Sequence, residues 1–377
     1  MDSLHTPKQQ RLVIILFCGF LFAMSILYLC LPREDFSQQE KRYLAQAPKV
    51  TWEAVSSGEF SGDVDTFMAD HIPGRNFFVG LNSLFDLFTG RQNSKDILLT
   101  WDGFLVEAPV VGDPDTIEKN MSVINSFASK QTIPVDLMVV PSAGWASRDR
   151  IPGFHPPYPD EAIIDSIYEQ ASEMLHPVDI LSVFSDTGAP EALYYRTDHH
   201  WNSAGAYTAC KTYMDHLDRE FPAPEDYRIE TVSDFRGSAH SRSALWMIPG
   251  EPLELWTGSS GIQVTHESLP QPHAGVFFRE RLSEADKYTV FLDGNHALVR
   301  LENPDAAGQG KLLVIRDSFS NCLGGFLADS FETVVLADLR YYRQPLSELI
   351  AEEGFDRILI CYSLGNFMTD TNIIWLR

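Results

Sequence analysis

The sequence predicts an α/β fold, in which helices flank a parallel β-sheet, and a single transmembrane helix at the N-terminus. Two observations predict it. From about residue 96 onward, short apolar runs alternate with amphipathic helical segments, a pattern typical of a parallel sheet covered on both faces. Residues 12–31 form an apolar run without a charge, and about twenty helical residues span roughly 30 Å, the thickness of bilayer hydrocarbon.

The composition limits the class of protein. The chain has 377 residues, 44% apolar and 12% aromatic, which suffices for a sizeable core and excludes wholesale disorder. Its 52 Asp and Glu outnumber its 29 Lys and Arg, and the formal net charge is −23. Such a surface repels phosphate backbones, so we expect no nucleic-acid partner. The five cysteines include no CxxC pair, so no disulfide framework, structural metal module or cofactor is predicted.

The apolar run at 12–31 favours a retained anchor over a cleaved signal peptide. It is longer than a signal-peptide core and ends in Leu-Pro-Arg-Glu instead of a small-residue cleavage site. Basic residues flank the run on both sides, so charge alone does not orient it. We adopt the hypothesis that residues 1–11 are a short cytoplasmic leader and that the domain is exported. This hypothesis predicts a single-pass protein of the cell membrane with its domain on the extracytoplasmic side.

The segment after the run, residues 32–57, is polar and punctuated by Pro, Ser and Gly, and we expect an extended stalk there. Residues 58–377 are assigned to one domain. The domain begins with two short helices around a Pro-Gly turn, because apolar residues recur at helical spacing on both sides of it. The charged residues Asp70, His71 and Arg75 form either a functional cluster or a set that holds this turn together, and the second interpretation is favoured.

The remaining elements alternate along the chain. Apolar, β-branched runs predict strands and amphipathic runs predict helices. The expected strands lie at 97–100, 104–106, 135–140, 311–316, 333–337 and 357–361. The expected helices lie at 115–130, 161–175, 203–220 and 346–353, with another that follows strand 311–316 and ends near Asp329. Residues 221–310 are less periodic, and we expect short strands and loops there, packed over the site.

A first group of reactive side chains lies at 194–202, YYRTDHHWN, just before a predicted helix. An Asp beside a His orients the imidazole and stabilises the imidazolium that forms when the ring takes a proton. In an extended chain, side chains two residues apart point the same way, which makes Asp198 and His200 the natural dyad. His199 is then expected to point away and to be structural. A purely structural role for the whole His pair stays open.

A second group, IRDSFSN at 315–321, follows an apolar strand. Reactive groups in open α/β sheets gather at the carboxyl ends of the strands, where the next helix supplies free N–H groups. Ser318 is therefore a candidate nucleophile, and nearby backbone amides could stabilise an oxyanion. An equally open alternative is that Ser318 caps the following helix. The GxSxG form of ordinary α/β-hydrolases is missing.

The string YYRTDHHWNSAGAY at 194–207 resembles the signature of the DHHW family. Proteins of that family are similar to the SGNH-hydrolase-like domains of bacterial alginate O-acetylation proteins, which carry an Asp-x-His-Trp motif followed later by a serine. The resemblance extends to FSQQEKRYLAQAP at 36–48, DHIPGRNFF at 70–78 and IRDSFS at 315–320. It covers most of residues 36–377 and implies an SGNH-hydrolase-like sheet flanked by helices.

For function, the resemblance implies an O-acetyltransferase that acts on a cell-surface or exported polysaccharide. Asp198 would orient the base His200, and Ser318 would be the nucleophile. A multi-pass membrane O-acyltransferase is the implied acetyl-donating partner. A carbohydrate acetylesterase of the same fold and a non-catalytic polysaccharide-binding or assembly protein are the alternatives. Ordinary SGNH hydrolases place the serine block first and an Asp-x-x-His block last, whereas here the order is reversed and the spacing is one residue shorter.

Three further residues are weaker candidates. Arg340 follows a strand and could steady negative charge, or it could form a surface salt bridge. Asn366 could donate to an oxyanion as an Asn does in SGNH sites, or it could belong to a Gly-Asn turn. Trp201 is expected to pack beneath the dyad, and stacking on a sugar is the second choice.

A metal site is the rival use of the polar residues near the dyad. A metal needs two or three converging ligands, and adjacent histidines diverge in an extended chain, so this alternative is disfavoured and no metal is predicted. Its ligands would come from Asp198, His199, His200, His216 and His240.

Overall fold

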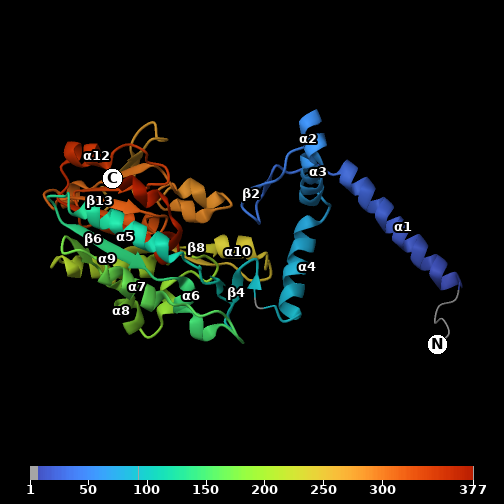
Figure 1. Cartoon of the computed structure of the whole chain (residues 1–377), viewed down its shortest axis with the longest axis horizontal. Helices are drawn as coiled ribbons and strands as arrows, with labels where there is room; N and C mark the ends of the chain where they lie inside the picture. Colours follow the sequence, from blue (N-terminus) through green and yellow to red (C-terminus); the bar gives the residue numbers. More distant parts are fainter. Residues whose placement is uncertain (1–6, 92, 377) are drawn as a thin grey trace. The chain divides into compact units, whose positions relative to one another are not determined.

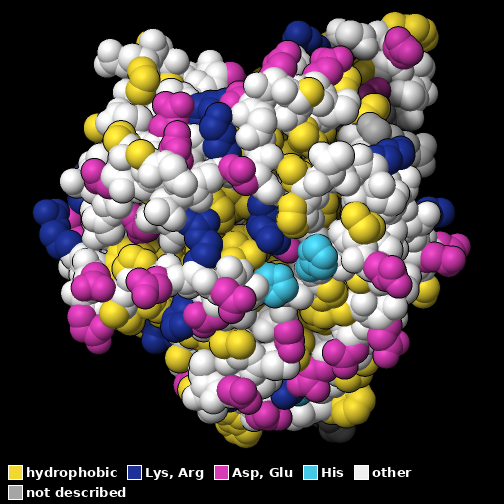
Figure 2. All heavy atoms as spheres, turned by 90° about the vertical axis from the view of Figure 1, so that its left-hand side faces the viewer, with side chains coloured by type: hydrophobic (Ala, Val, Ile, Leu, Met, Phe, Trp, Pro, Cys, Tyr) yellow, Lys and Arg dark blue, Asp and Glu magenta, His cyan; other side chains and the backbone are white. Residues whose placement is uncertain are grey.

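The computed structural model describes residues 7–91 and 93–376 (Figure 1). The chain divides into two compact units, Met1–Thr89 and Gly90–Arg377. The sequence-based boundary before residue 58 differs from this division, because helices that we assigned to the α/β domain pack with the segment that precedes them. Figure 2 shows one face of the chain, on which Asp and Glu side chains are spread widely with Lys and Arg among them.

The N-terminal unit begins with helix α1 (Pro7–Cys30). Within the described residues, it contains the one stretch, Gln10–Cys30, that is long and apolar enough to cross a membrane. Length and composition of this kind suit a membrane anchor and also a signal sequence.

The predicted stalk at 32–57 is not wholly extended. It contains the antiparallel pair β1 (Phe36–Ser37) and β2 (Arg42–Tyr43), followed by helix α2 (Trp52–Ser57). Thr51 caps α2 by accepting a hydrogen bond from the Ala54 N–H, and a side-chain cap of this kind stabilises even a short helix. The prediction of an extended segment was therefore wrong for these residues.

Helices α3 (Glu59–Asp70) and α4 (Arg75–Phe88) flank the Pro-Gly turn, as the helical spacing predicted. Asp70 accepts hydrogen bonds from the Arg42 guanidinium and from the Ala45 N–H, the latter at 2.9 Å. The bond from Arg42 lowers the pKa of Asp70 to about 2. His71 Nε2 lies 2.9 Å from the Ala45 carbonyl oxygen, and Arg75 pairs with Glu40 at 2.7 Å. These charged residues thus hold the turn to the preceding segment.

The C-terminal unit is built on a mixed sheet, which in the described residues has eight strands in the order β11-β10-β12-β14-β13-β15-β6-β7. Its strands are β6 (Val135–Val140), β7 (Leu175–Pro177), β10 (Gln263–His266), β11 (His273–Ala274), β12 (Leu298–Glu302), β13 (Lys311–Arg316), β14 (Thr333–Ala337) and β15 (Arg357–Ser363). The strands from β14 to β7 are parallel, and β10, β11 and β12 extend the sheet with antiparallel pairs. The predicted α/β class with a parallel-rich sheet is confirmed.

Helices cover both faces of this sheet (Figure 1). They are α5 (Pro114–Ala128), α6 (Ala143–Ala146), α7 (Asp160–Glu169), α8 (Ile180–Asp186), α9 (Ser203–His216), α11 (Ser320–Ala328), α12 (Leu346–Glu353) and α13 (Leu364–Thr369). Side chains alternate between the faces along β13. Leu312 and Val314 enter the core shared with α9 and α11, whereas Leu313 and Ile315 enter the core shared with α5 and α12.

Two predicted helices are shorter than expected. The helix expected at 161–175 ends at Glu169, and β7 follows at Leu175–Pro177, where it pairs with β6 at the edge of the sheet. That pairing is a long-range contact without a local signal. The helix expected at 203–220 ends at His216, because Asp218 adopts a left-handed backbone with φ +53 that a right-handed helix cannot continue.

Smaller sheets account for the other expected strands. The predicted strands at 97–100 and 104–106 are β4 (Ile97–Leu99) and β5 (Leu105–Glu107), which join β3 (Asn93–Ser94) in a separate antiparallel sheet. Residues 221–310 hold the antiparallel pair β8 (Arg228–Phe235) and β9 (Glu251–Thr257), helix α10 (Ser238–Ser243) and strands β10 to β12.

A partly buried ion pair links two neighbouring strands. Asp136 on β6 is fully buried, and it accepts hydrogen bonds of 2.8 Å from the Arg357 guanidinium on β15 and from the Tyr213 hydroxyl on α9. We expect Asp136→Ala to lower the free energy of unfolding by about 3 kcal/mol, because it leaves a partly buried guanidinium without its carboxylate. Chemical denaturation of the purified protein measures this change.

The matched control is an exposed pair on α9. Lys211 Nζ lies 2.6 Å from an Asp215 carboxylate oxygen, and both side chains are at least half exposed. Lys211→Ala should cost less than about 0.5 kcal/mol. Equal losses for the two variants would contradict the structural importance of Asp136.

Candidate active site

Ser318 lies in the turn between β13 and α11, at the carboxyl end of the parallel strands, and its side chain is partly exposed. Its hydroxyl does not cap α11, since the N-cap residue is Phe319 and makes no side-chain cap bond. The Ser318 Oγ lies instead 2.8 Å from His200 Nε2. The structure thus brings together two segments whose meeting could not be predicted from spacing.

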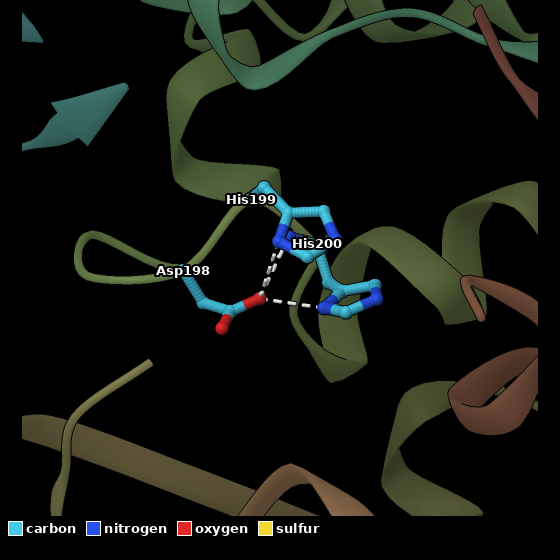
Figure 3. A group of neighbouring side chains, drawn as sticks. All are labelled: Asp198, His199 and His200. Atoms are coloured by element: carbon cyan, nitrogen blue, oxygen red, sulfur yellow. Dashed lines mark hydrogen bonds and ion pairs between the residues drawn. The ribbon is translucent and has the colours of Figure 1, made fainter. Parts of the chain in front are cut away.

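Asp198 completes a hydrogen-bonded series with these two residues. Its Oδ1 lies 2.5 Å from His200 Nδ1 and accepts a second bond, at 3.0 Å, from the His200 N–H (Figure 3). With the Nδ1 proton directed at a carboxylate, Nε2 presents its lone pair to the serine hydroxyl. Asp198 and His200 are both buried, at 2% and 6% exposed. The arrangement can draw a proton from Ser318 and stabilise the imidazolium that results.

The second carboxylate oxygen of Asp198 is held from the segment at 221–310. The Ser238 N–H donates to Asp198 Oδ2 at 2.6 Å, and Gly237 packs directly against the same carboxylate. A Cβ placed on Gly237 would come within 2.3 Å of Asp198 Oδ2. The close approach of this backbone therefore requires glycine and fixes the direction of the carboxylate.

His199 does not point away from the dyad. Its Nδ1 lies 3.6 Å from Asp198 Oδ1, its ring is 3.9 Å from the His200 ring, and Figure 3 shows both rings on the side of the same oxygen. The prediction of divergence was wrong because residues 196–200 form bends and not the extended chain that it assumed. His199 Nδ1 also lies 2.6 Å from the Ser238 hydroxyl, and burial lowers the pKa of this imidazole.

Three residues of the alternative metal site lie close together beside Ser318. Ligand atoms of Asp198, His199 and His200 all lie within 4.8 Å of one another. His216 is elsewhere, with Nε2 3.6 Å from the buried Asp136, and His240 packs against Trp246. In this structure His200 uses both ring nitrogens for Asp198 and Ser318, and we refer to these three hydrogen-bonded residues as the relay.

Aromatic side chains enclose the His200 ring. Tyr288 stacks on it with ring centroids 4.0 Å apart and planes 8° apart, and the Tyr288 hydroxyl reaches to 3.5 Å from the Ser318 carbonyl oxygen. Phe319 lies at 4.9 Å from the same ring. Sequence reasoning missed Tyr288, which belongs to a short 3-10 turn at Lys287–Val290 without periodicity or motif.

Trp201 lies beneath the dyad, as the first of its two interpretations predicted. It is fully buried and donates from its indole Nε1 to the Phe319 carbonyl oxygen at 3.1 Å. A side chain with no exposed face cannot stack on a sugar, so the second interpretation is wrong. The indole instead ties the segment that carries His200 to the turn that carries Ser318.

Asp317 anchors the turn of Ser318 to the next strand. Its Oδ1 accepts from the Phe319 N–H, and its Oδ2 accepts from the Ser363 N–H, the Ser363 hydroxyl and the Asn366 carboxamide, all within 3.0 Å. The carboxylate is 1% exposed. One buried anion thereby joins the end of β13 to the end of β15. A carboxylate next to a candidate nucleophile was the signal that could have identified it.

The two other weak candidates each bind a buried carboxylate. Asn366 uses a carboxamide N–H on Asp317, so its first role is to hold that carboxylate. Arg340 forms bonds of 2.9 and 2.6 Å to the two oxygens of the buried Asp338, which is the salt-bridge alternative that the sequence left open.

A pocket that is partly open to solvent borders the relay on the side of His199 and Phe319. Its walls are mostly apolar, with Tyr158, Leu364 and Met368 among them. Asp160 also lines the pocket, and burial raises the pKa of this carboxyl. An apolar pocket with few polar groups is the usual form of a small-molecule site.

The close contact at Gly237 predicts a specific defect. Gly237→Ala should push Asp198 away from His200 and lower the free energy of unfolding by about 1–3 kcal/mol through overpacking. A short Asp–His hydrogen bond gives a strongly downfield imidazole N–H proton signal in NMR, and we expect this signal to disappear in the variant. Gly62→Ala on α3, where a Cβ meets nothing within 4 Å, is the control. An unchanged downfield signal in Gly237→Ala would contradict the prediction.

Comparisons with known proteins show what this chain is similar to. The family model described as DHHW protein matches residues 172–337, which include Asp198, His200 and Ser318. No curated protein matches the sequence. A DHHW family protein from Eubacterium siraeum has a similar structure, with a TM-score of 0.64 and 22% identity, in a match that covers 75% of this chain and 95% of that chain.

Two further structures are similar. Bacillus cereus PatB1, solved with a sulfonyl adduct, matches with a TM-score of 0.63 and 20% identity, covering 74% of this chain and 98% of that one. The O-acetyltransferase domain of Pseudomonas putida AlgJ is more distant, at a TM-score of 0.46 and 13% identity, covering 73% and 92%. Identities this low bear on the fold alone. The resemblance to the DHHW family is thus confirmed, by the family model over residues 172–337 and by the fold over three quarters of the chain.

Proposed function

We propose that the protein is a membrane-anchored, extracytoplasmic O-acetyltransferase that modifies a cell-surface or exported polysaccharide. The hydrogen-bonded series Asp198–His200–Ser318 carries the proposal, because its distances of 2.5 and 2.8 Å are those at which a general base activates a serine. The confirmed DHHW resemblance supports the acetylation chemistry. PatB1, of similar fold, was solved with a sulfonyl adduct, and we expect this chain also to react with sulfonyl reagents.

The first half-reaction forms an acetyl ester on Ser318. The Ser318 Oγ attacks the acetyl carbonyl carbon while His200 Nε2 takes the hydroxyl proton, and Asp198 stabilises the imidazolium. The tetrahedral intermediate then expels the donor's leaving group, which takes that proton from His200. In the second half-reaction a sugar hydroxyl gives its proton to His200 and attacks the ester, and Ser318 recovers a proton as the acetylated sugar departs.

The oxyanion of each intermediate needs donors beside Ser318. The N–H groups of Phe319 and Asn321 are already used within the turn, on the Asp317 carboxylate and the Ser318 carbonyl oxygen. We therefore assign the N–H of Ser318 itself as the first donor and the second carboxamide N–H of Asn366 as the other. Arg340 is left out because both carboxylate oxygens of Asp338 hold it.

The acetyl donor and the sugar acceptor both have to reach Ser318. We propose the apolar pocket beside His199 and Phe319 as the site where the acyl chain or sugar is held. The acceptor is a polysaccharide, and a multi-pass membrane O-acyltransferase is the partner that brings the acetyl group across the membrane. No cofactor takes part in the steps above.

Replacement of Ser318 tests the reaction. The purified protein is incubated with a chromogenic acetyl ester, with and without an oligosaccharide acceptor, and with a fluorophosphonate label. We expect wild-type protein to be labelled and to transfer acetyl to the sugar, and Ser318→Ala to lose labelling and to lower the turnover rate by at least about 1,000-fold. Ser320→Ala, two residues away, should keep both.

The other outcomes separate the alternatives. Ester hydrolysis without transfer to any acceptor would identify a carbohydrate acetylesterase. A wild-type protein that never labels, together with a Ser318→Ala strain whose polysaccharide phenotype is unchanged, would identify a non-catalytic binding or assembly protein.

We also propose that α1 is retained as an anchor and that the α/β unit is extracytoplasmic. The mature protein should then keep its full mass of 42.5 kDa, stay in the membrane fraction after alkaline extraction, and be digested by protease added to cells whose outer layers are permeabilised. A mature N-terminus beyond residue 31 would contradict retention. Protection from the added protease, lost only on lysis, would contradict export.

A further inference from the structure

A second polar cluster lies in the segment at 221–310, outside the relay. His266 ends strand β10, and Asp293 and His296 belong to the loop that precedes β12. The two imidazole rings are stacked, with centroids 3.6 Å apart and planes 20° apart. The three side chains are 0, 8 and 11% exposed in chain order, so the cluster is largely withdrawn from solvent.

The distances in the cluster are those of metal ligands. Asp293 Oδ2 lies 3.4 Å from His266 Nε2 and 3.5 Å from His296 Nε2, and the ligand atoms of all three residues lie within 4.8 Å of one another. Two ligand atoms bound about 2.1 Å from a tetrahedral ion are roughly 3.4 Å apart. Two imidazoles with one carboxylate are also a set that suits divalent first-row metals.

The buried nitrogen of His266 points to a missing partner. Its Nε2 makes no hydrogen bond within the part of the chain that the structure describes, although it is inaccessible to solvent. A buried polar atom without a partner is costly. The Asp293 Oδ1 is occupied by the Arg281 guanidinium, so Oδ2 remains as the oxygen that faces the histidines.

Ligation requires His296 Nε2 to give up one contact, since it lies 3.1 Å from the Asp293 carbonyl oxygen. The other surroundings suit ligation by both histidines. Glu267 Oε1 lies 3.5 Å from His296 Nδ1, the position from which a carboxylate orients a metal-bound imidazole. The Ser268 N–H lies 3.4 Å from His266 Nδ1, a long bond whose loss costs little when the ring proton moves to Nδ1. Coordination of one ion requires the two rings to turn about their Cβ–Cγ bonds, and such torsions have broad minima.

We propose that His266, Asp293 and His296 bind a divalent transition-metal ion of the zinc type, with water at the fourth position. The ion would fix the loop at 293–296. This loop also carries Asn295, whose Oδ1 accepts hydrogen bonds from Arg316 at 3.1 Å and from Asn321 at 3.0 Å, on both sides of the Ser318 turn. The site therefore stabilises the frame of the relay without belonging to it.

Zinc binding by the purified full-length protein tests the proposal. A competition titration with a chromogenic chelator should give one Zn²⁺ per chain, and Co²⁺ should give the visible absorption of a tetrahedral site. His266→Gln and His296→Gln should each weaken Zn²⁺ binding by at least about tenfold. Zn²⁺ should also raise the midpoint of thermal unfolding of the wild type but not of His296→Gln. If the buried His266 variant fails to fold, the partly exposed His296 variant decides.

Two controls make the result specific. His273→Gln changes a histidine of the neighbouring strand. The His273 ring stacks on Phe278, and its Nδ1 lies 2.9 Å from the Gly275 carbonyl oxygen. This variant should bind Zn²⁺ as the wild type does. Asp198→Asn should also retain binding. The proposal is overturned if folded wild-type protein binds no Zn²⁺, if His296→Gln binds it unchanged, or if Asp198→Asn alone abolishes binding.

Discussion

The hydrogen bond between His200 Nε2 and Ser318 Oγ is the contact on which the site depends, because it joins residues 118 positions apart in the chain. Neither partner is held by that bond alone. Asp198 and Tyr288 fix the imidazole in its plane and over its face, and Asp317 fixes the turn of the serine. Separate elements therefore hold the two atoms 2.8 Å apart. We expect a change in any of these elements to move the pair apart.

The order of the strands explains how these distant residues meet. Strands β6 and β7 come early in the chain yet lie parallel to β15 and β13 in the sheet. Parallel strands share one carboxyl edge. The turn with Ser318 directly follows β13 and lies at this edge. The segment with His200 comes after β7 and α8, and its hydrogen bonds to Ser318 and Phe319 hold it at the same edge.

The sequence predicted well those elements that a local residue pattern encodes. Apolar runs located β13 and β14 to the residue, and the DHHW motif located the dyad. The reasoning for the dyad was nevertheless faulty, since it assumed an extended chain where the structure has bends. The three-residue strand β7 and the stacked Tyr288 were missed, because both depend on long-range contacts that leave no periodic signal. The contact between Asn366 and Asp317 was not predicted, because Asp317 was not recognised as a buried anchor.

The irregular segment at 221–310 is part of the site. The edge of the sheet positions the reactive side chains, but it leaves their outer faces exposed to water. Gly237 and Ser238 close one side of the Asp198 carboxylate, and Tyr288 covers one face of the His200 ring. Exclusion of water strengthens the hydrogen bond between the carboxylate and the imidazole. The relay therefore depends on a segment whose sequence has no motif. The packing of this segment holds the side chains of the relay in place.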